Sequence, residues 1–149
     1  MRDPGSIVYL DMDDDFFWSS SNNGIAFSYN TLPTATDAPA DMAMYGFEND
    51  EGKQVGLYTI LDTGSSHMLL GRSYFAGFFD VLMKYSAGPG KRILYYSDRG
   101  SIFTRDCGDR VWPTVYFMLD TLWVEVRPQD YLYDASDASD WSLCGFYFT

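Results

Sequence analysis

Short runs of hydrophobic residues, alternating with polar ones and separated by turn-forming residues, dominate the chain. Such runs are typical of β-strands. They occur at residues 7–10, 25–29, 42–47, 55–61, 93–97, 101–104, 114–119, 122–126 and 143–148. We expect 42–47 and 55–61 to form a hairpin around 48–53, and 31–41 and 131–141 to be loops. In 122–126, the alternation places Leu122, Val124 and Val126 on one face of the strand and Trp123 and Glu125 on the other.

Residues 73–84 repeat with a different period, that of an α-helix. Phe75, Phe78, Phe79 and Leu82 would share one face of this helix. Ser73 is the expected N-cap, and the Gly-Pro-Gly sequence at 88–90 would end the helix. One helix among many strands makes the fold class mainly β.

Length and composition narrow the possibilities for this chain. A length of 149 residues suits a single domain, 1–149, and the 46% hydrophobic content can build a core. The net charge of −11 disfavours nucleic acid and anionic membrane surfaces as partners, because it would repel phosphates. No apolar run reaches the length of a membrane span, and residues 1–10 lack the basic and apolar regions of a signal peptide. If the parent protein is secreted, we expect its signal upstream of this sequence.

The chain contains two cysteines, Cys107 and Cys144. A disulfide between them would close a loop of about 37 residues and contribute roughly 3–4 kcal/mol to stability in the chain-entropy model. Two buried thiols in a reducing compartment are the alternative, and the spacing alone does not separate the two readings.

The candidate chemistry lies in the sequence Tyr-Thr-Ile-Leu-Asp-Thr-Gly-Ser-Ser at residues 58–66. An apolar strand that ends in this way would place the carboxylate of Asp62 at a buried turn, where it can polarise a water molecule. Gly64 would allow a close approach of the backbone, whose N–H can then donate to that carboxylate. An ordinary turn at the end of a strand is the alternative, because Asp, Thr, Gly and Ser are common there.

The same sequence resembles the active-site motif of the pepsin-like aspartic endopeptidases. The helical segment at 73–84, Cys107, the Trp-Pro sequence at 112–113, the Pro-x-x-Tyr sequence at 128–131 and Cys144 are similar to the second, C-terminal lobe of that family. The resemblance is strongest over 57–149. It implies one lobe of the double-psi acid-protease β-barrel, with a short helix after the active-site loop.

The resemblance also implies roles for individual residues. Asp62 would be catalytic, and Thr63, Gly64 and Ser65 would support the active-site loop, with the Gly64 N–H and the Ser65 hydroxyl bonded to the carboxylate. Ile60 would contact substrate on the primed side of the cleft. The implied reaction is hydrolysis of peptide bonds in a polypeptide substrate, without a metal or organic cofactor. A Cys107–Cys144 disulfide and a secretory, extracellular or lysosome-like location would follow.

The chain departs from the family pattern in two respects. It holds a single Asp-Thr-Gly sequence, whereas the reaction needs two aspartates, and the family's closing strands after the second cysteine are missing. We therefore expect a truncated lobe that takes its second aspartate from another lobe or from a homodimer partner. The alternative is a catalytically inactive pepsin-like domain that binds protein or peptide.

Other clusters of polar residues have simpler explanations. Asp11, Asp13 and Asp15 match the first ligand positions of an EF-hand loop, but Phe16 replaces its glycine, so a solvated acidic turn is expected. Ser66 and His67 are adjacent, and adjacent residues of a strand face opposite sides. A Ser–His nucleophile pair is therefore not expected. One histidine and two distant cysteines predict no zinc site.

Overall fold

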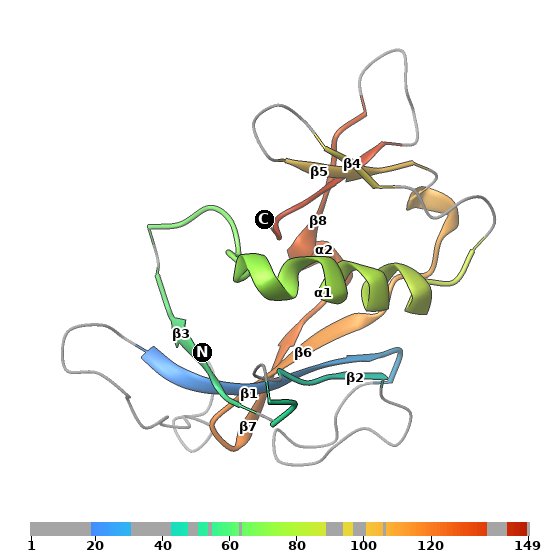
Figure 1. Ribbon diagram of the computed structural model, residues 1–149. Coiled ribbons are helices and arrows are strands. Elements are labelled where there is room, and N and C mark those ends of the chain that lie inside the picture. The colour runs from blue at the N-terminus through green and yellow to red at the C-terminus, as the bar shows by residue number, and fades with distance from the viewer. Residues whose placement is uncertain are drawn as a thin grey trace, which may run out of the picture.

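A computed structural model of the chain describes residues 19–30, 43–47, 51–53, 55–62, 64–88, 94–96, 101–105, 107–136 and 143–148. These residues form two antiparallel β-sheets and few helices (Figure 1), which confirms the mainly β class. The strand predicted at 7–10, the acidic turn at 11–15, the loop at 31–41 and Thr63 lie outside the described residues.

The first sheet is built around one long strand, β1 (Ser19–Ser28). On one side it pairs with β6 (Thr114–Leu119), which continues through a tight turn into β7 (Leu122–Val126). Asp120 in that turn has a positive φ of 52°, a conformation that Asp tolerates better than most residues. Both strands have the boundaries that the alternating pattern predicts. Their pairing needs only a local hairpin.

The hairpin predicted between 42–47 and 55–61 is wrong, because both segments lie on the other side of β1. β2 (Ala43–Tyr45) and β3 (Leu57–Ile60) do not pair with each other; each pairs antiparallel with β1. β2 lies along the second half of β1 and β3 along its first half. Together they form one interrupted edge strand. A hydrogen bond of 2.8 Å, from the Val55 N–H to the Phe47 carbonyl, links the two ends of the interruption. Because β1 has ten residues, its edge can satisfy both short strands.

The second sheet contains β4 (Leu94–Tyr96), β5 (Ile102–Thr104), β9 (Cys144–Phe146) and β8 (Leu132–Asp134), in that order. Two short helical turns, η2 (Cys107–Asp109) and α2 (Pro128–Tyr131), lie along the connections. Residues 131–141 were predicted as a loop, but 132–134 form β8 because they pair with β9. The local sequence does not reveal that partner.

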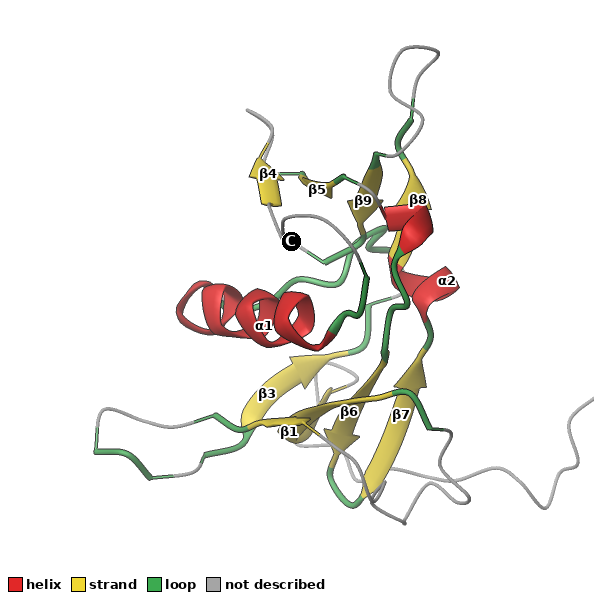
Figure 2. Ribbon diagram, turned by 90° about the vertical axis from the view of Figure 1, so that its right-hand side faces the viewer, coloured by secondary structure: helices red, strands yellow, loops and turns green. Residues whose placement is uncertain are grey.

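Helix α1 (Arg72–Tyr85) lies between the two sheets, as Figure 2 shows. Phe78, Phe79 and Leu82 are buried and Phe75 is half-buried, which confirms the predicted apolar face. The predicted N-cap is wrong: the helix begins one residue earlier, and Gly71 is its N-cap. The Gly71 carbonyl accepts the N–H groups of Tyr74 and Phe75 at 2.9 and 3.1 Å.

The main hydrophobic core joins both sheets to α1. From the first sheet it includes Ile25 and Phe27, and from the second Ile102 and Phe146. Phe148 is fully buried, with its ring centroid 4.7 Å from that of Phe78. The opposite face of the first sheet carries a smaller cluster of Ala26, Tyr116 and Trp123. The first sheet is therefore apolar on both faces.

Cys144 is disulfide-bonded, and no described cysteine is free. The chain has one other cysteine, Cys107, whose side chain lies outside the described part. The Cys107–Cys144 pairing therefore stays a prediction.

Candidate functional site

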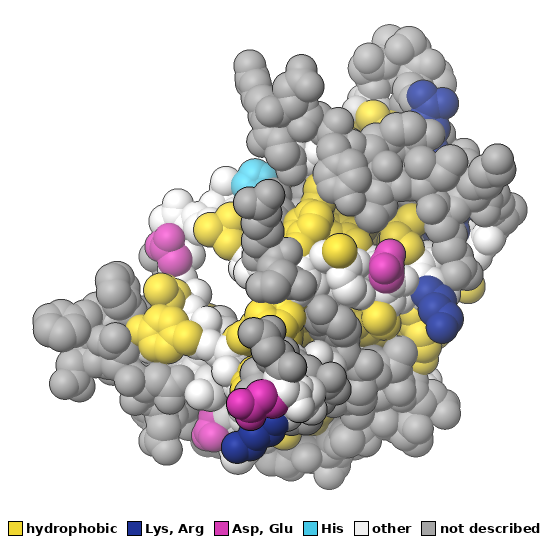
Figure 3. Space-filling model, in the orientation of Figure 1, with side chains coloured by type: hydrophobic (Ala, Val, Ile, Leu, Met, Phe, Trp, Pro, Cys, Tyr) yellow, Lys and Arg dark blue, Asp and Glu magenta, His cyan; other side chains and the backbone are white. Residues whose placement is uncertain are grey.

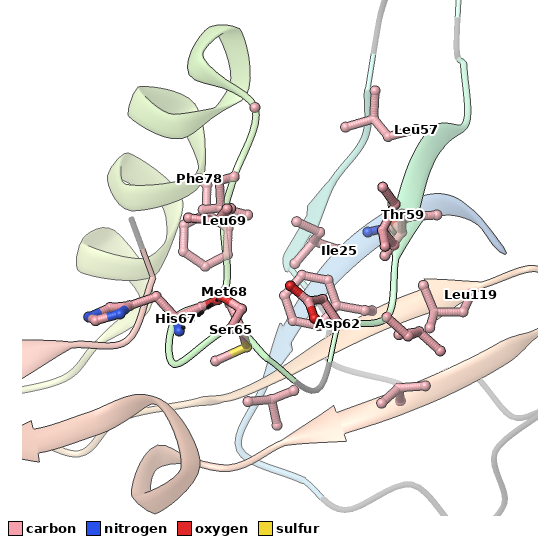
Figure 4. A pocket seen from close by; sticks show the side chains of 18 of the residues that line it. Ile25, Leu57, Thr59, Asp62, Ser65, His67, Met68, Leu69, Phe78 and Leu119 are labelled. Carbon is pink, nitrogen blue, oxygen red and sulfur yellow. Dashed lines mark hydrogen bonds between the residues drawn. The ribbon is translucent and has the colours of Figure 1, made fainter. Parts of the chain in front are cut away.

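A cavity of about 820 Å³ opens between the first sheet and the start of α1. β3 and the segment after it form one wall, residues of β6 and β7 form the floor, and α1 contributes Tyr74 and Phe78. Most of the lining is apolar, and Figure 4 shows side chains from these elements converging on the same space. A volume of this size suits a small organic ligand or a few side chains of a bound peptide.

Exposed hydrophobic side chains are concentrated at this cavity. Among the described residues, seven large hydrophobic side chains are exposed, and five of them line it. These five are Tyr58, Ile60, Leu61, Leu69 and Val124. Leu69 is the most exposed, at 77%. Figure 3 shows hydrophobic side chains around α1 and the hollow beside it. Such a concentration is typical of a binding surface.

Asp62 lies at this cavity, two residues after β3 ends. Its Oδ1 accepts the backbone N–H of Gly64 at 2.8 Å, as the motif predicts. The predicted buried turn is wrong, because Asp62, Gly64 and Ser65 are all exposed. β3 is an edge strand of the described sheet, so the chain that leaves it enters solvent rather than the core.

Ser65 supports the loop in a different way from the prediction. Its hydroxyl donates to the His67 carbonyl at 2.7 Å rather than to Asp62, and it accepts the His67 N–H at 3.3 Å. The Ser65 N–H lies 3.4 Å from the Asp62 carbonyl. These local bonds link Asp62, Ser65 and His67. Ile60 lines the cavity and is 47% exposed.

The prediction that the side chains of Ser66 and His67 point apart is wrong. The Ser66 hydroxyl lies 3.0 Å from His67 Nδ1, within hydrogen-bonding distance. The prediction assumed a strand, whereas both residues lie in a bend, where adjacent side chains can meet. The His67 ring contacts Tyr147 edge-on, with centroids 5.9 Å apart. In Figure 4 it points away from Asp62.

A contact distant in sequence holds this loop in place. The Met68 N–H donates to the Tyr147 carbonyl at 2.7 Å, and Met68 forms a parallel β-bridge with Phe148. Because Phe148 is fully buried in the core, residues 147–148 connect the Asp62 loop to α1. The pattern at 143–148 predicts a strand but not this partner, so sequence reasoning missed it.

The charge around the cavity is negative. Its charged lining residues, among those described, are Asp62 and Asp130. Asp130 is already engaged: its Oδ2 lies 3.3 Å from Arg127 Nε and accepts the Arg127 backbone N–H at 3.0 Å. No group of three metal-ligating side chains occurs in the described ranges. Of the described helices, none is long and apolar enough to cross a membrane.

No protein-family profile, no curated protein and no solved structure matches this chain.

Proposed function

We propose that the chain is one lobe of a pepsin-like aspartic endopeptidase, of the second-lobe type, with the double-psi barrel of that family. Asp62 supplies one carboxylate of the catalytic pair. The second comes from another lobe or from a second copy of this chain. The substrate is an extended polypeptide in the apolar cavity.

The position of Asp62 carries this proposal. Its carboxylate is exposed at the wall of a cavity of about 820 Å³ and accepts the Gly64 N–H, two residues after the end of β3. A carboxylate held by one backbone N–H keeps lone pairs free for water, which is what a general base needs. The apolar lining favours binding of large apolar side chains on either side of a scissile bond.

In the proposed mechanism, two carboxylates share one proton and one water molecule. One carboxylate takes a proton from the water as it attacks the peptide carbonyl carbon. The other donates its proton to the carbonyl oxygen, which gives a tetrahedral diol. The first carboxyl then gives the proton it took from water to the leaving nitrogen as the C–N bond breaks, and one diol hydroxyl returns its proton to the second carboxylate. Two carboxylates this close cannot both ionise readily, as aspartic proteases in general illustrate, so the pair works at acid pH.

The disulfide at Cys144 supports the proposed compartment. Disulfides persist in oxidising surroundings, so a secreted or lysosome-like location fits an acid protease of this kind.

A second candidate is a pepsin-like module that binds protein or peptide without cleaving it. The concentration of five exposed hydrophobic side chains at the cavity favours it, because binding alone requires such a surface. The other acid in the lining, Asp130, is engaged by Arg127, which also argues against a pair formed within this chain.

Cleavage of a denatured protein at acid pH, with and without pepstatin, tests the first proposal. We expect cleavage by the wild-type chain or its assembly, and a loss of at least about 100-fold in Asp62→Asn, because one carboxylate of the pair is then missing. Asp80→Asn, on the exposed face of α1 and away from the cavity, is the matched control and should cleave normally.

The molar mass of the active species, measured by light scattering, identifies the source of the second aspartate. A cleaving dimer would mean that two copies each give one Asp62. If folded chain neither cleaves nor binds pepstatin, at any concentration or mixed with a first lobe, the protease proposal is refuted and the binding module remains.

A further inference from the structure

We propose that the cavity beside Asp62 is a binding site for small organic cations, molecules in which an alkyl or aryl body carries one ammonium group. This inference goes beyond peptide hydrolysis and does not depend on it. It requires Asp62 and the apolar walls of this chain alone, without a second aspartate.

The walls fit the apolar part of such a ligand. Ile60, Leu61 and Leu69 are all about half exposed or more, yet they surround one hollow rather than lying scattered over the surface. Phe117, which is half-buried, contributes aromatic surface to the same cavity. A ligand that covered these side chains would remove apolar area from water, which is favourable at roughly 25 cal/mol per Å².

Asp62 fits the ammonium group. Its Oδ1 receives one N–H, from Gly64, and no Lys, Arg or His side chain in the described part of the chain forms an ion pair with it. A carboxylate has about four acceptor positions, so most of its capacity is open toward the cavity. Figure 4 shows the carboxylate between the side that carries Leu69 and the side that carries Thr59. An ammonium there would gain a charge-assisted hydrogen bond next to apolar surface.

Other ligand classes fit the same site less well. An anion would be repelled by Asp62 and by a chain with a net charge of −11. A metal ion would find one carboxylate where it needs several ligands. A neutral apolar molecule would contact the apolar walls. It would also leave the carboxylate beside it partly desolvated and without a partner. Only a molecule that combines an apolar body with a cation uses both features.

A comparison of 4-phenylbutylamine, 4-phenylbutanol and 4-phenylbutyrate, titrated into the purified chain at neutral pH and low salt, tests this proposal. The three probes share the same apolar body, so their dissociation constants isolate the charge. We expect the amine to bind about 3- to 10-fold more tightly than the alcohol, a modest factor because Asp62 is exposed to solvent. The acid should bind most weakly.

Three variants show whether the preference for the amine arises at the cavity. Asp62→Asn should remove most of the amine's advantage over the alcohol and leave the affinity of the alcohol unchanged. Asp80→Asn, which removes one negative charge from the exposed face of α1, should keep the preference for the amine. Leu69→Ser should weaken the binding of the amine and of the alcohol to the same extent, because it removes apolar surface from the cavity wall and no charge.

The wild-type chain offers an independent check should Asp62→Asn fold poorly. Raising the salt to about 0.5 M should remove most of the amine's advantage while leaving the alcohol's affinity intact. Equal affinities of amine and alcohol at low salt, an undiminished preference in folded Asp62→Asn, or no saturable binding of any probe would each overturn the proposal. Cleavage of denatured protein is a separate readout, so this inference and the protease proposal can fail independently.

Discussion

Tyr131 shows how one side chain connects several parts of this molecule. It is fully buried, its hydroxyl donates to the Pro113 carbonyl at 2.7 Å, and its ring packs against Phe148 with centroids 5.4 Å apart. Burial, with a smaller contribution from Tyr29, raises the pKa of Tyr131 far above the ordinary value of a tyrosine. The phenol therefore stays neutral in the folded protein under conditions that ionise it in the unfolded chain.

Tyr131→Phe tests both consequences at once. At neutral pH we expect the free energy of unfolding to fall by about 1–3 kcal/mol, because the buried Pro113 carbonyl loses its donor. A phenol whose folded pKa is raised stabilises the fold fully below the unfolded pKa of about 10, and that stability is lost as the pH rises above it. Wild-type stability should therefore fall above about pH 10, by up to about 1.4 kcal/mol per pH unit from this residue, and Tyr131→Phe should lose that part of the slope.

Urea unfolding at several pH values measures both effects. Tyr147→Phe is the control, because no described residue accepts a hydrogen bond from the Tyr147 hydroxyl. An unchanged stability of Tyr131→Phe at neutral pH would contradict the role given to this hydrogen bond.

At the candidate site, the sequence predicted the hydrogen bond between Asp62 and Gly64 correctly, because the two residues are only two positions apart in the motif. The Gly64 N–H donates to Asp62 because that bond closes a turn of fixed geometry. The Ser65 hydroxyl and the Ser66–His67 contact were predicted wrongly, because both depend on the bend that the chain adopts after Asp62. Side-chain partners in a bend follow from backbone angles that the sequence pattern does not reveal.

The pair β8 and β9 depends on a glycine. Gly145 lies opposite Tyr133 in the ladder, and a Cβ added there would sit 2.0 Å from Tyr133 Cζ. The Tyr133 ring therefore covers Gly145 directly, where it also packs against Tyr147 with centroids 4.9 Å apart. A side chain at 145 must displace this ring.

Gly145→Ala should lower the free energy of unfolding by about 1–3 kcal/mol, because the tyrosine ring has to leave its packed position. Tyr133→Ala removes the ring, so adding Gly145→Ala to that variant should cost much less. A double-mutant cycle by chemical unfolding measures this coupling. Additive losses would show that the ring and the glycine are independent.

Strands that pair with a sequence neighbour could be predicted, and strands with distant partners could not. The limits of β6 and β7 follow from alternation around a two-residue turn. By contrast, β2 and β3 were assigned to each other because they are neighbours in sequence, whereas β1 offers both of them a longer edge. β8 was missed because three residues carry too little pattern without β9 beside them.

The disulfide at Cys144 affects the stability of the whole molecule. Cys144 is the first residue of β9, which lies in the second sheet. Cys144→Ser should lower the free energy of unfolding by about 2–4 kcal/mol, because the unfolded chain gains the freedom of a loop of about 37 residues. Thermal unfolding with and without reductant measures the loss, and the reductant should leave Cys144→Ser unaffected. Mass spectrometry of unreduced peptides should find Cys107 joined to Cys144; two reactive thiols in the native protein would contradict the pairing.

The bridge between Met68 and Phe148 has a consequence for how the protein is made. A ribosome that has finished the Asp62 loop must still add about 80 residues before the strand that anchors this loop exists, which takes about 4–16 s at ordinary translation rates. Through that interval the leucine and tyrosine walls of the cavity have no fixed shape and stay open to chaperones. The site therefore cannot form before residue 148 has been synthesised, and a nascent chain shorter than this can neither bind nor cleave a ligand there.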